Sequence, residues 1–149
     1  MAEVVAAWRN DYGIDGIDLD IEAGAGDKAE AGPNMVHFIR RLKALQPDML
    51  VTQPTYGYPQ VQAEIDVINA SWKVGGGSNG LADSVGIMVY EGTQSLQYVN
   101  NFAHGSSQWE GFPITVSRNL SEIPLMLNLL GGRANHSDPG GVQGILQEY

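Results

Sequence analysis

Acidic residues recur at every second position in one short segment near the start of the chain. They are Asp18, Asp20 and Glu22, and they alternate with Ile17, Leu19 and Ile21. Because a strand turns successive side chains to opposite faces, the alternation predicts a strand over residues 14–22 with one acidic and one apolar face. Like charges on one face repel each other and lose hydration when they are buried, which packing alone does not explain. The segment therefore predicts a site of carboxylate chemistry.

Neighbouring carboxyl groups are suited to general acid catalysis. Like charges at short range oppose each other's ionisation, which raises the pKa of at least one group, and a general acid near neutral pH needs a raised pKa. Glu22 ends the predicted strand and is followed by Gly24 and Gly26. In βα barrels the reacting groups sit where strands run into the following loops, so Glu22 is the predicted acid.

The acidic segment has two alternative interpretations, a calcium loop and a solvated strand face. A calcium loop needs polar residues and a central Gly between its ligands, whereas Ile17, Leu19 and Ile21 need an apolar partner surface. A solvated face conflicts with the parallel strands predicted below, because parallel strands are usually covered on both sides. Both alternatives fit the pattern less well than a catalytic strand.

Helical and strand patterns alternate along the rest of the chain. Helices are predicted at residues 2–12, 35–45, 59–70, 96–103 and 138–146, and further strands at residues 49–52, 85–90 and 123–130, with a small extra strand at 114–116. Residues 59–70 also fit a strand, although a helix is favoured. In the first helix, Trp8 falls on the apolar side and is expected in the core. This order predicts one α/β domain over residues 1–149, built from parallel βα units.

Composition restricts the partners of the chain. The net charge is −9, which disfavours nucleic acids and anionic membranes, so a neutral or cationic partner is expected. The chain has no cysteine, and the spacing of His37, His104 and His136 does not suggest zinc, so we expect no metal and no cofactor. Residues 1–12 do not have the pattern of a signal peptide, and no segment has the length of apolar sequence that a membrane helix needs. The compartment stays undetermined.

Two motifs resemble family 18 of the glycoside hydrolases, which contains chitinases and endo-β-N-acetylglucosaminidases. Residues 15–22 resemble the family signature Asp-x-x-Asp-x-Asp-x-Glu, and residues 83–91 resemble its sixth strand, which usually ends Met-x-Tyr-Asp. The resemblance implies a fragment of a TIM (β/α)8 barrel, about the fourth to seventh βα units, forming one partial catalytic domain. Such a barrel typically needs about 250 residues, so four units cannot close it.

The resemblance implies hydrolysis of β-1,4 bonds in chitin, a polymer of N-acetylglucosamine, by a substrate-assisted retaining mechanism without a cofactor. Glu22 would be the acid and later the base, and Asp20 would orient the acetamido group of the sugar. Asp18 would hold Asp20 in the required protonation state, and Tyr90 would donate a hydrogen bond to the oxazolinium ring. The alternatives are an endo-β-N-acetylglucosaminidase acting on glycans and a non-catalytic chitin-binding lectin.

Further residues are candidates for binding the substrate: Asp15, Gln53, Tyr56, Met88 and Glu91. Strict alternation turns Asp15 to the apolar side unless Gly16 permits a bulge. Gln53 and Tyr56 close a predicted strand and could reach a sugar from the neighbouring loop, and a buried amide or loop packing is the equal alternative. Glu91 replaces the usual Asp of the family, and the extra methylene displaces its carboxylate by about 1 Å.

Aromatic residues and open sheet edges give the last expectations. Trp72 and Trp109 could stack on pyranose rings, with core packing as the alternative. Four βα units leave strand edges without partners, which predicts self-association with another copy or with the missing half of the barrel.

Overall fold

The computed structural model describes residues 1–21, 24–26, 28–55, 61–73, 77–88 and 125–128. Its elements in chain order are α1 (Ala2–Tyr12), β1 (Gly16–Asp18), α2 (Ala31–Leu45), β2 (Leu50–Thr55), α3 (Gln62–Ser71), β3 (Ser84–Met88) and β4 (Leu125–Asn128). The predicted helices at 96–103 and 138–146 and the small strand at 114–116 lie outside the described residues. From α1 to β3, helices and strands alternate as predicted, and the predicted helix at residues 59–70 is present as α3.

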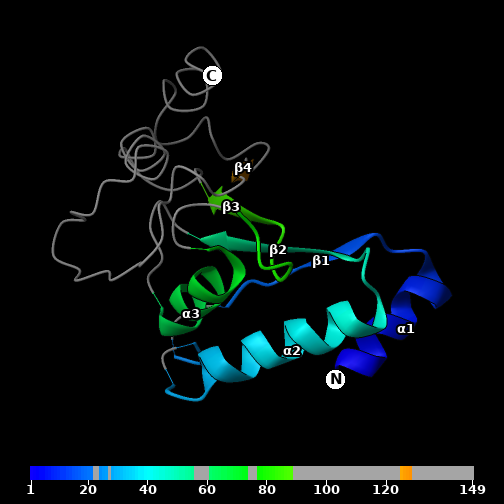
Figure 1. Ribbon diagram of the computed structural model, residues 1–149, viewed down its shortest axis with the longest axis horizontal. Helices are drawn as coiled ribbons and strands as arrows, with labels where there is room; N and C mark the ends of the chain where they lie inside the picture. The colour runs from blue at the N-terminus through cyan, green and yellow to red at the C-terminus, as the bar shows by residue number, and fades with distance from the viewer. Residues whose placement is uncertain (22–23, 27, 56–60, 74–76, 89–124, 129–149) are drawn as a thin grey trace, which may run out of the picture.

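The four strands form one parallel sheet in the order β1, β2, β3, β4, so that each strand pairs with the next one along the chain. Asp18 lies opposite Thr52, and Thr52 lies opposite Ser84. Helices α1, α2 and α3 all lie on one side of this sheet (Figure 1). The chain is therefore an α/β protein with an open parallel sheet, which confirms the prediction of βα units.

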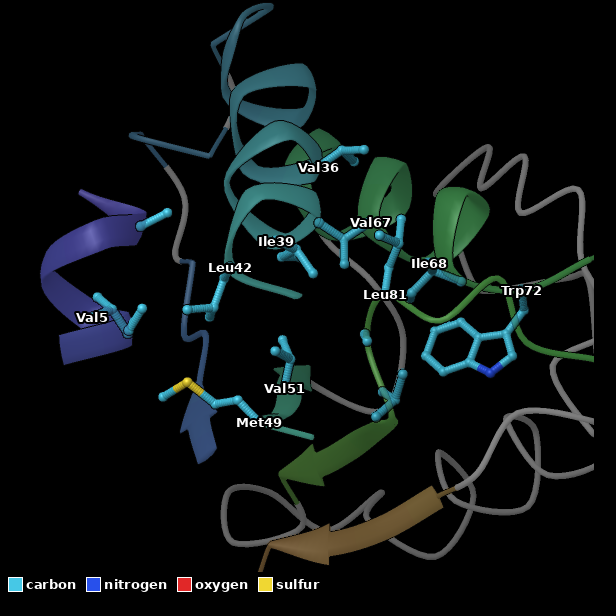
Figure 2. Packing of buried hydrophobic residues seen from close by; sticks show 14 residues of the cluster. Val5, Val36, Ile39, Leu42, Met49, Val51, Val67, Ile68, Trp72 and Leu81 are labelled. Carbon is cyan, nitrogen blue, oxygen red and sulfur yellow. The ribbon is translucent and has the colours of Figure 1, made fainter. Parts of the chain in front are cut away.

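The hydrophobic core lies between the helices and the sheet. Ile39 and Leu42 of α2, Val67 of α3 and Val51 of β2 are fully buried and belong to one cluster (Figure 2). Because side chains alternate along a strand, Val51 marks the face of β2 that the helices cover. Ile17 on β1 lies opposite Val51 and packs against the same cluster, so it marks the same face of β1.

Helices α1 and α2 end where the sequence predicts. Gly13 follows α1 with a φ of 67° and donates its backbone N–H to the carbonyl oxygen of Arg9 at 3.0 Å. Glycine adopts this left-handed conformation without steric cost, which explains the stop. Helix α2 ends at Leu45, just before Pro47, but it begins at Ala31, earlier than predicted, with Pro33 in its first turn. Proline is tolerated there because the first N–H groups of a helix have no partner within it.

The structure corrects the expected position of Trp8 and decides between the two interpretations of Trp72. Trp8 is 42% exposed, so its predicted place in the core is wrong. Helix α1 buries the small residues Ala2 and Ala6 together with Val5 instead, which lets it approach α2 closely. Trp72 is only 3% exposed and belongs to the hydrophobic cluster (Figure 2), so it packs in the core and is not open to a sugar ring. Trp109 lies outside the described residues.

Candidate functional site

Strand β1 presents two of the three predicted carboxylates to solvent. Asp18 is the last residue of β1, Asp20 follows two positions later, and both are exposed. Ile17 and Leu19 pack against the hydrophobic core on the other face. The predicted alternation is therefore confirmed over residues 17–20. The regular strand is shorter than predicted, although the N–H of Leu19 still donates to the carbonyl oxygen of Thr52 at 2.8 Å.

Thr52 of the neighbouring strand holds Asp18 by a side-chain contact. The two residues are opposite each other in the parallel ladder. The hydroxyl group of Thr52 donates a hydrogen bond to Oδ1 of Asp18. Since Asp18 faces away from the helices, Thr52 lies on this same face, which we call the acidic face.

Gly16 allows β1 to lie close to β2 at the start of the acidic segment. A Cβ atom at this position would lie 2.6 Å from the carbonyl oxygen of Leu50 and 2.7 Å from its Cβ. Both distances are shorter than van der Waals contact, and one of the atoms belongs to the backbone. A side chain at residue 16 would therefore displace β1 and with it the carboxylate of Asp18.

Asp15 lies at the opposite end of β1 from Asp20. It is exposed and precedes the strand, and its carbonyl oxygen accepts a hydrogen bond from the N–H of Leu50 at 2.9 Å. Its backbone therefore belongs to the contact between β1 and β2. The structure does not bring its side chain to the carboxyl end of the sheet.

Gln53 and Met88 lie on different faces of the sheet. Gln53 is fully buried and shares the parity of Val51, which places it on the helix-covered face, away from Asp18. Neither polar atom of its side chain has a hydrogen-bond partner among the described residues. Met88 shares the parity of Ser84, the residue opposite Thr52, so it lies on the acidic face at the carboxyl end of β3. The parity of Gln53 with Val51 was the sequence signal that could have separated it from the site.

The remaining predicted site residues lie outside the described residues. They are Glu22, Tyr56, Tyr90 and Glu91. Of the nine candidates, the structure places Asp18 and Met88 on the acidic face and Asp20 just after β1, with Met88 four residues further along the sheet than the level of Asp18. It separates Asp15 and Gln53 from them.

At the amino end of the sheet, Asp83 makes contacts that sequence reasoning missed. Its Oδ2 accepts hydrogen bonds from Nζ of Lys43 and from the backbone N–H of Val51, both at 2.7 Å. The side chain of Lys43 is 13% exposed, so its charge is largely shielded from water. A single acidic residue before a strand carries no pattern that would identify this role.

The acidic face can bind polar groups and exchange protons. Exposed carboxylates accept hydrogen bonds from N–H and O–H groups of a ligand, and carboxyl groups act as general acids or bases in catalysis. Within the part of the chain that the structure describes, no group of three or more His, Cys, Asp or Glu side chains is arranged to hold a metal ion. In the same part, no helix is long and apolar enough to cross a membrane.

Fold and site together define an α/β protein with a parallel sheet and an acidic strand at its edge. No protein-family model, curated protein or solved structure matches the chain.

Proposed function

We propose that this chain forms part of a glycoside hydrolase barrel of the family 18 type and hydrolyses β-1,4 bonds in N-acetylglucosamine polymers. One observation carries the proposal. Asp18 and Asp20 are exposed on the face of a parallel sheet that the helices leave open, at the carboxyl end of their strand. In βα barrels this end of the strands carries the reacting groups.

In the proposed reaction, the substrate supplies the nucleophile. Glu22 donates its proton to the glycosidic oxygen as the bond from that oxygen to the anomeric carbon breaks. The carbonyl oxygen of the N-acetyl group attacks the anomeric carbon and closes an oxazolinium ring. Water then opens the ring with retained configuration and returns a proton to Glu22, so one protein acid serves both steps.

Three further side chains assist this reaction in the proposal. Asp20 accepts a hydrogen bond from the acetamido N–H and stabilises the ring that forms. Asp18 keeps Asp20 in the required protonation state, and Tyr90 donates a hydrogen bond to the oxazolinium ring. Met88 lies on the acidic face and is proposed to line the sugar pocket, which the alternation along β3 supports.

The proposed barrel extends beyond this sequence. Four parallel strands in sequential order, with helices on one face, are the arrangement expected for half of an eight-stranded barrel. The other strands would belong to a longer polypeptide or to a partner, and the single catalytic domain proposed for residues 1–149 would be one part of the enzyme. Among the described strands, β1 pairs only with β2, so its other edge supports the proposal of self-association.

The test is hydrolysis of chitin oligosaccharides by the polypeptide that carries this chain. The Glu22→Gln variant retains the size of the side chain but cannot donate the proton, so kcat should fall by at least about 100-fold. Glu30→Gln makes the same change at an exposed position just before α2 and should leave kcat unchanged. Equal turnover by the wild type and Glu22→Gln would exclude Glu22 as the acid.

The alternative functions give different outcomes in the same assay. If the wild type binds insoluble chitin without cleaving it, the protein is a lectin and the proposed hydrolysis is wrong. If it cleaves the chitobiose core of a glycan and leaves chitin intact, the chemistry stands but the substrate is a glycan. Sedimentation of the protein with insoluble chitin measures the first result, and mass spectrometry of the products measures the second.

A further inference from the structure

We infer that Thr52 is a positioning residue of the acidic site, because its hydroxyl group holds the carboxylate of Asp18 in one orientation on the acidic strand. The inference rests on the proposed function for its catalytic consequence. Its structural part is that Thr52 orients the side chain of Asp18, and this can be tested without measuring enzymatic activity.

The contact joins two residues that the sheet already fixes opposite each other. Asp18 and Thr52 are partners in the parallel ladder between β1 and β2. The N–H of Leu19 donates to the carbonyl oxygen of Thr52 at 2.8 Å, so the backbone on both sides of the contact is held. Thr52 is also β-branched, which restricts rotation about its χ1 angle. The donor is therefore in place before the carboxylate binds it.

The hydroxyl proton of Thr52 has two acceptors within reach. The first is Oδ1 of Asp18, and the second is the carbonyl oxygen of Ile17 at 3.5 Å. Asp18 is the nearer acceptor, and an ionised acceptor forms the stronger hydrogen bond. The hydroxyl group of Thr52 is therefore assigned as a hydrogen-bond donor to Asp18.

Without this bond, little else that the structure describes would select an orientation for Asp18. The side chain is exposed, and an exposed side chain samples several staggered rotamers. In the proposed reaction Asp18 acts on Asp20, which requires one defined arrangement of the two carboxyl groups. A hydrogen bond from the neighbouring strand provides that arrangement before a substrate binds, and such preorganisation avoids reorientation during the reaction.

Gly16 supports the same contact from the backbone. A Cβ atom there would overlap the carbonyl oxygen of Leu50, so only glycine lets the start of β1 lie at this distance from β2. Two residues further on, Thr52 bridges the same two strands through its side chain. Strand β2 therefore positions the acidic strand at two successive points on one face.

The direct experiment measures the χ1 angle of Asp18 by NMR, from three-bond couplings between its Cγ and the backbone N and carbonyl carbon. The wild type should show a single rotamer. The Thr52→Val variant keeps the branched shape but removes the hydroxyl group, and its couplings should be averaged over several rotamers. The Thr52→Ser variant restores the hydroxyl group and should return Asp18 to the single rotamer.

Thr55→Val is the matched control, because Thr55 is on the same strand but its odd position turns it to the helix-covered face. It should leave the couplings of Asp18 unchanged. Backbone amide spectra of all variants report whether each one folds. If Asp18 keeps its single rotamer in folded Thr52→Val, or if Thr52→Ser behaves like Thr52→Val, the inference is wrong.

Kinetics on chitin oligosaccharides test the catalytic consequence. Thr52→Val should lower kcat about 10-fold with little change in KM, because orientation of reacting groups affects the chemical step. Thr52→Ser should recover most of the loss. If Thr52→Val averages the rotamers of Asp18 but keeps the full kcat, Thr52 has no role in the reaction. If even the wild type has no turnover, the proposed function fails, and the couplings alone decide whether Thr52 orients Asp18.

Discussion

The two sides of the parallel sheet both carry acidic residues, but the surroundings of these residues differ. On the helix-covered side, Asp83 accepts hydrogen bonds from the ammonium group of Lys43 of α2 and the N–H of Val51. On the open side, Asp18 and Asp20 are exposed, and Asp18 accepts a hydrogen bond from the neutral hydroxyl group of Thr52. The first carboxylate is matched by a positive charge, whereas the other two have a like charge beside them.

The comparison separates structural carboxylates from those available for chemistry. A carboxylate paired with a shielded cation and a backbone amide stabilises the fold, and breaking such a pair leaves groups without partners. Adjacent exposed carboxylates repel each other and contribute little to stability. In βα proteins such unfavourable clusters at the carboxyl ends of strands are typical of functional sites. The expected effects of substitution should therefore differ between the two sides of the sheet.

The largest effect is expected for Asp83→Ala on the helix-covered side. The substitution leaves the charge of Lys43 largely shielded without its partner and removes the acceptor of the Val51 N–H. The free energy of unfolding should fall by about 2 kcal/mol, as measured by urea denaturation.

Lys43→Met provides the control for this pair. Methionine keeps the apolar stem and removes the charge. The double variant of Lys43→Met and Asp83→Ala should therefore lose less free energy of unfolding than the two single variants lose together. Strict additivity would mean that the contact between the two side chains contributes nothing to stability.

A much smaller effect is expected for the same substitution on the open side. Asp20→Ala removes one of two like charges on an exposed segment, so the free energy of unfolding should stay within about 0.5 kcal/mol of the wild type or rise slightly. Urea denaturation under the conditions used for Asp83→Ala measures this directly. A loss as large as that of Asp83→Ala would remove the distinction between the two sides of the sheet.

The smallest effect concerns the exposed pair of Glu3 and Arg41, which joins α1 to α2. Nε of Arg41 donates to Oε1 of Glu3 at 2.8 Å, and this hydrogen bond is the main reason why the pKa of Glu3 is lowered from its usual 4.5. A lowered pKa in the folded state means that the pair stabilises the fold above about pH 4.5 and that this contribution disappears as the pH falls through the folded-state pKa.

Comparison with Glu3→Gln as a function of pH tests the pair. The wild type should be slightly more stable at neutral pH, and the two stabilities should converge in acid. High salt should reduce the difference at neutral pH, because both side chains are exposed. A difference that persists unchanged below the pKa of Glu3 would contradict an ionic origin.

The order of helices and strands could be predicted because it depends on local sequence patterns. Gly13 and Pro47 gave correct helix ends, and the alternation of apolar and acidic residues gave the two faces of β1 over residues 17–20. Short apolar runs between helices predicted parallel strands, since such strands are covered by the helices that connect them.

Burial and side-chain contacts could not be predicted in the same way, because they depend on neighbours that are distant in the sequence. Whether Trp8 is buried depends on which side of α1 contacts α2, and the small residues of α1 decide this. The contacts of Asp83 and Thr52 join residues more than 30 positions apart, so no local pattern could indicate them. For Gln53 the strand end left a substrate contact and a buried amide as equal alternatives, and its parity with Val51 places it under the helices as a buried amide. The predictions for Glu22, Tyr56, Tyr90 and Glu91 stay predictions.

The sequential strand order has a consequence for how this protein folds. From β1 to β3, each strand pairs with the next one along the chain, so each of these pairings closes only one βα unit. Closing short loops costs less chain entropy than closing long ones. These strands can therefore pair one after another in chain order, and no step among them has to wait for a distant segment of the chain.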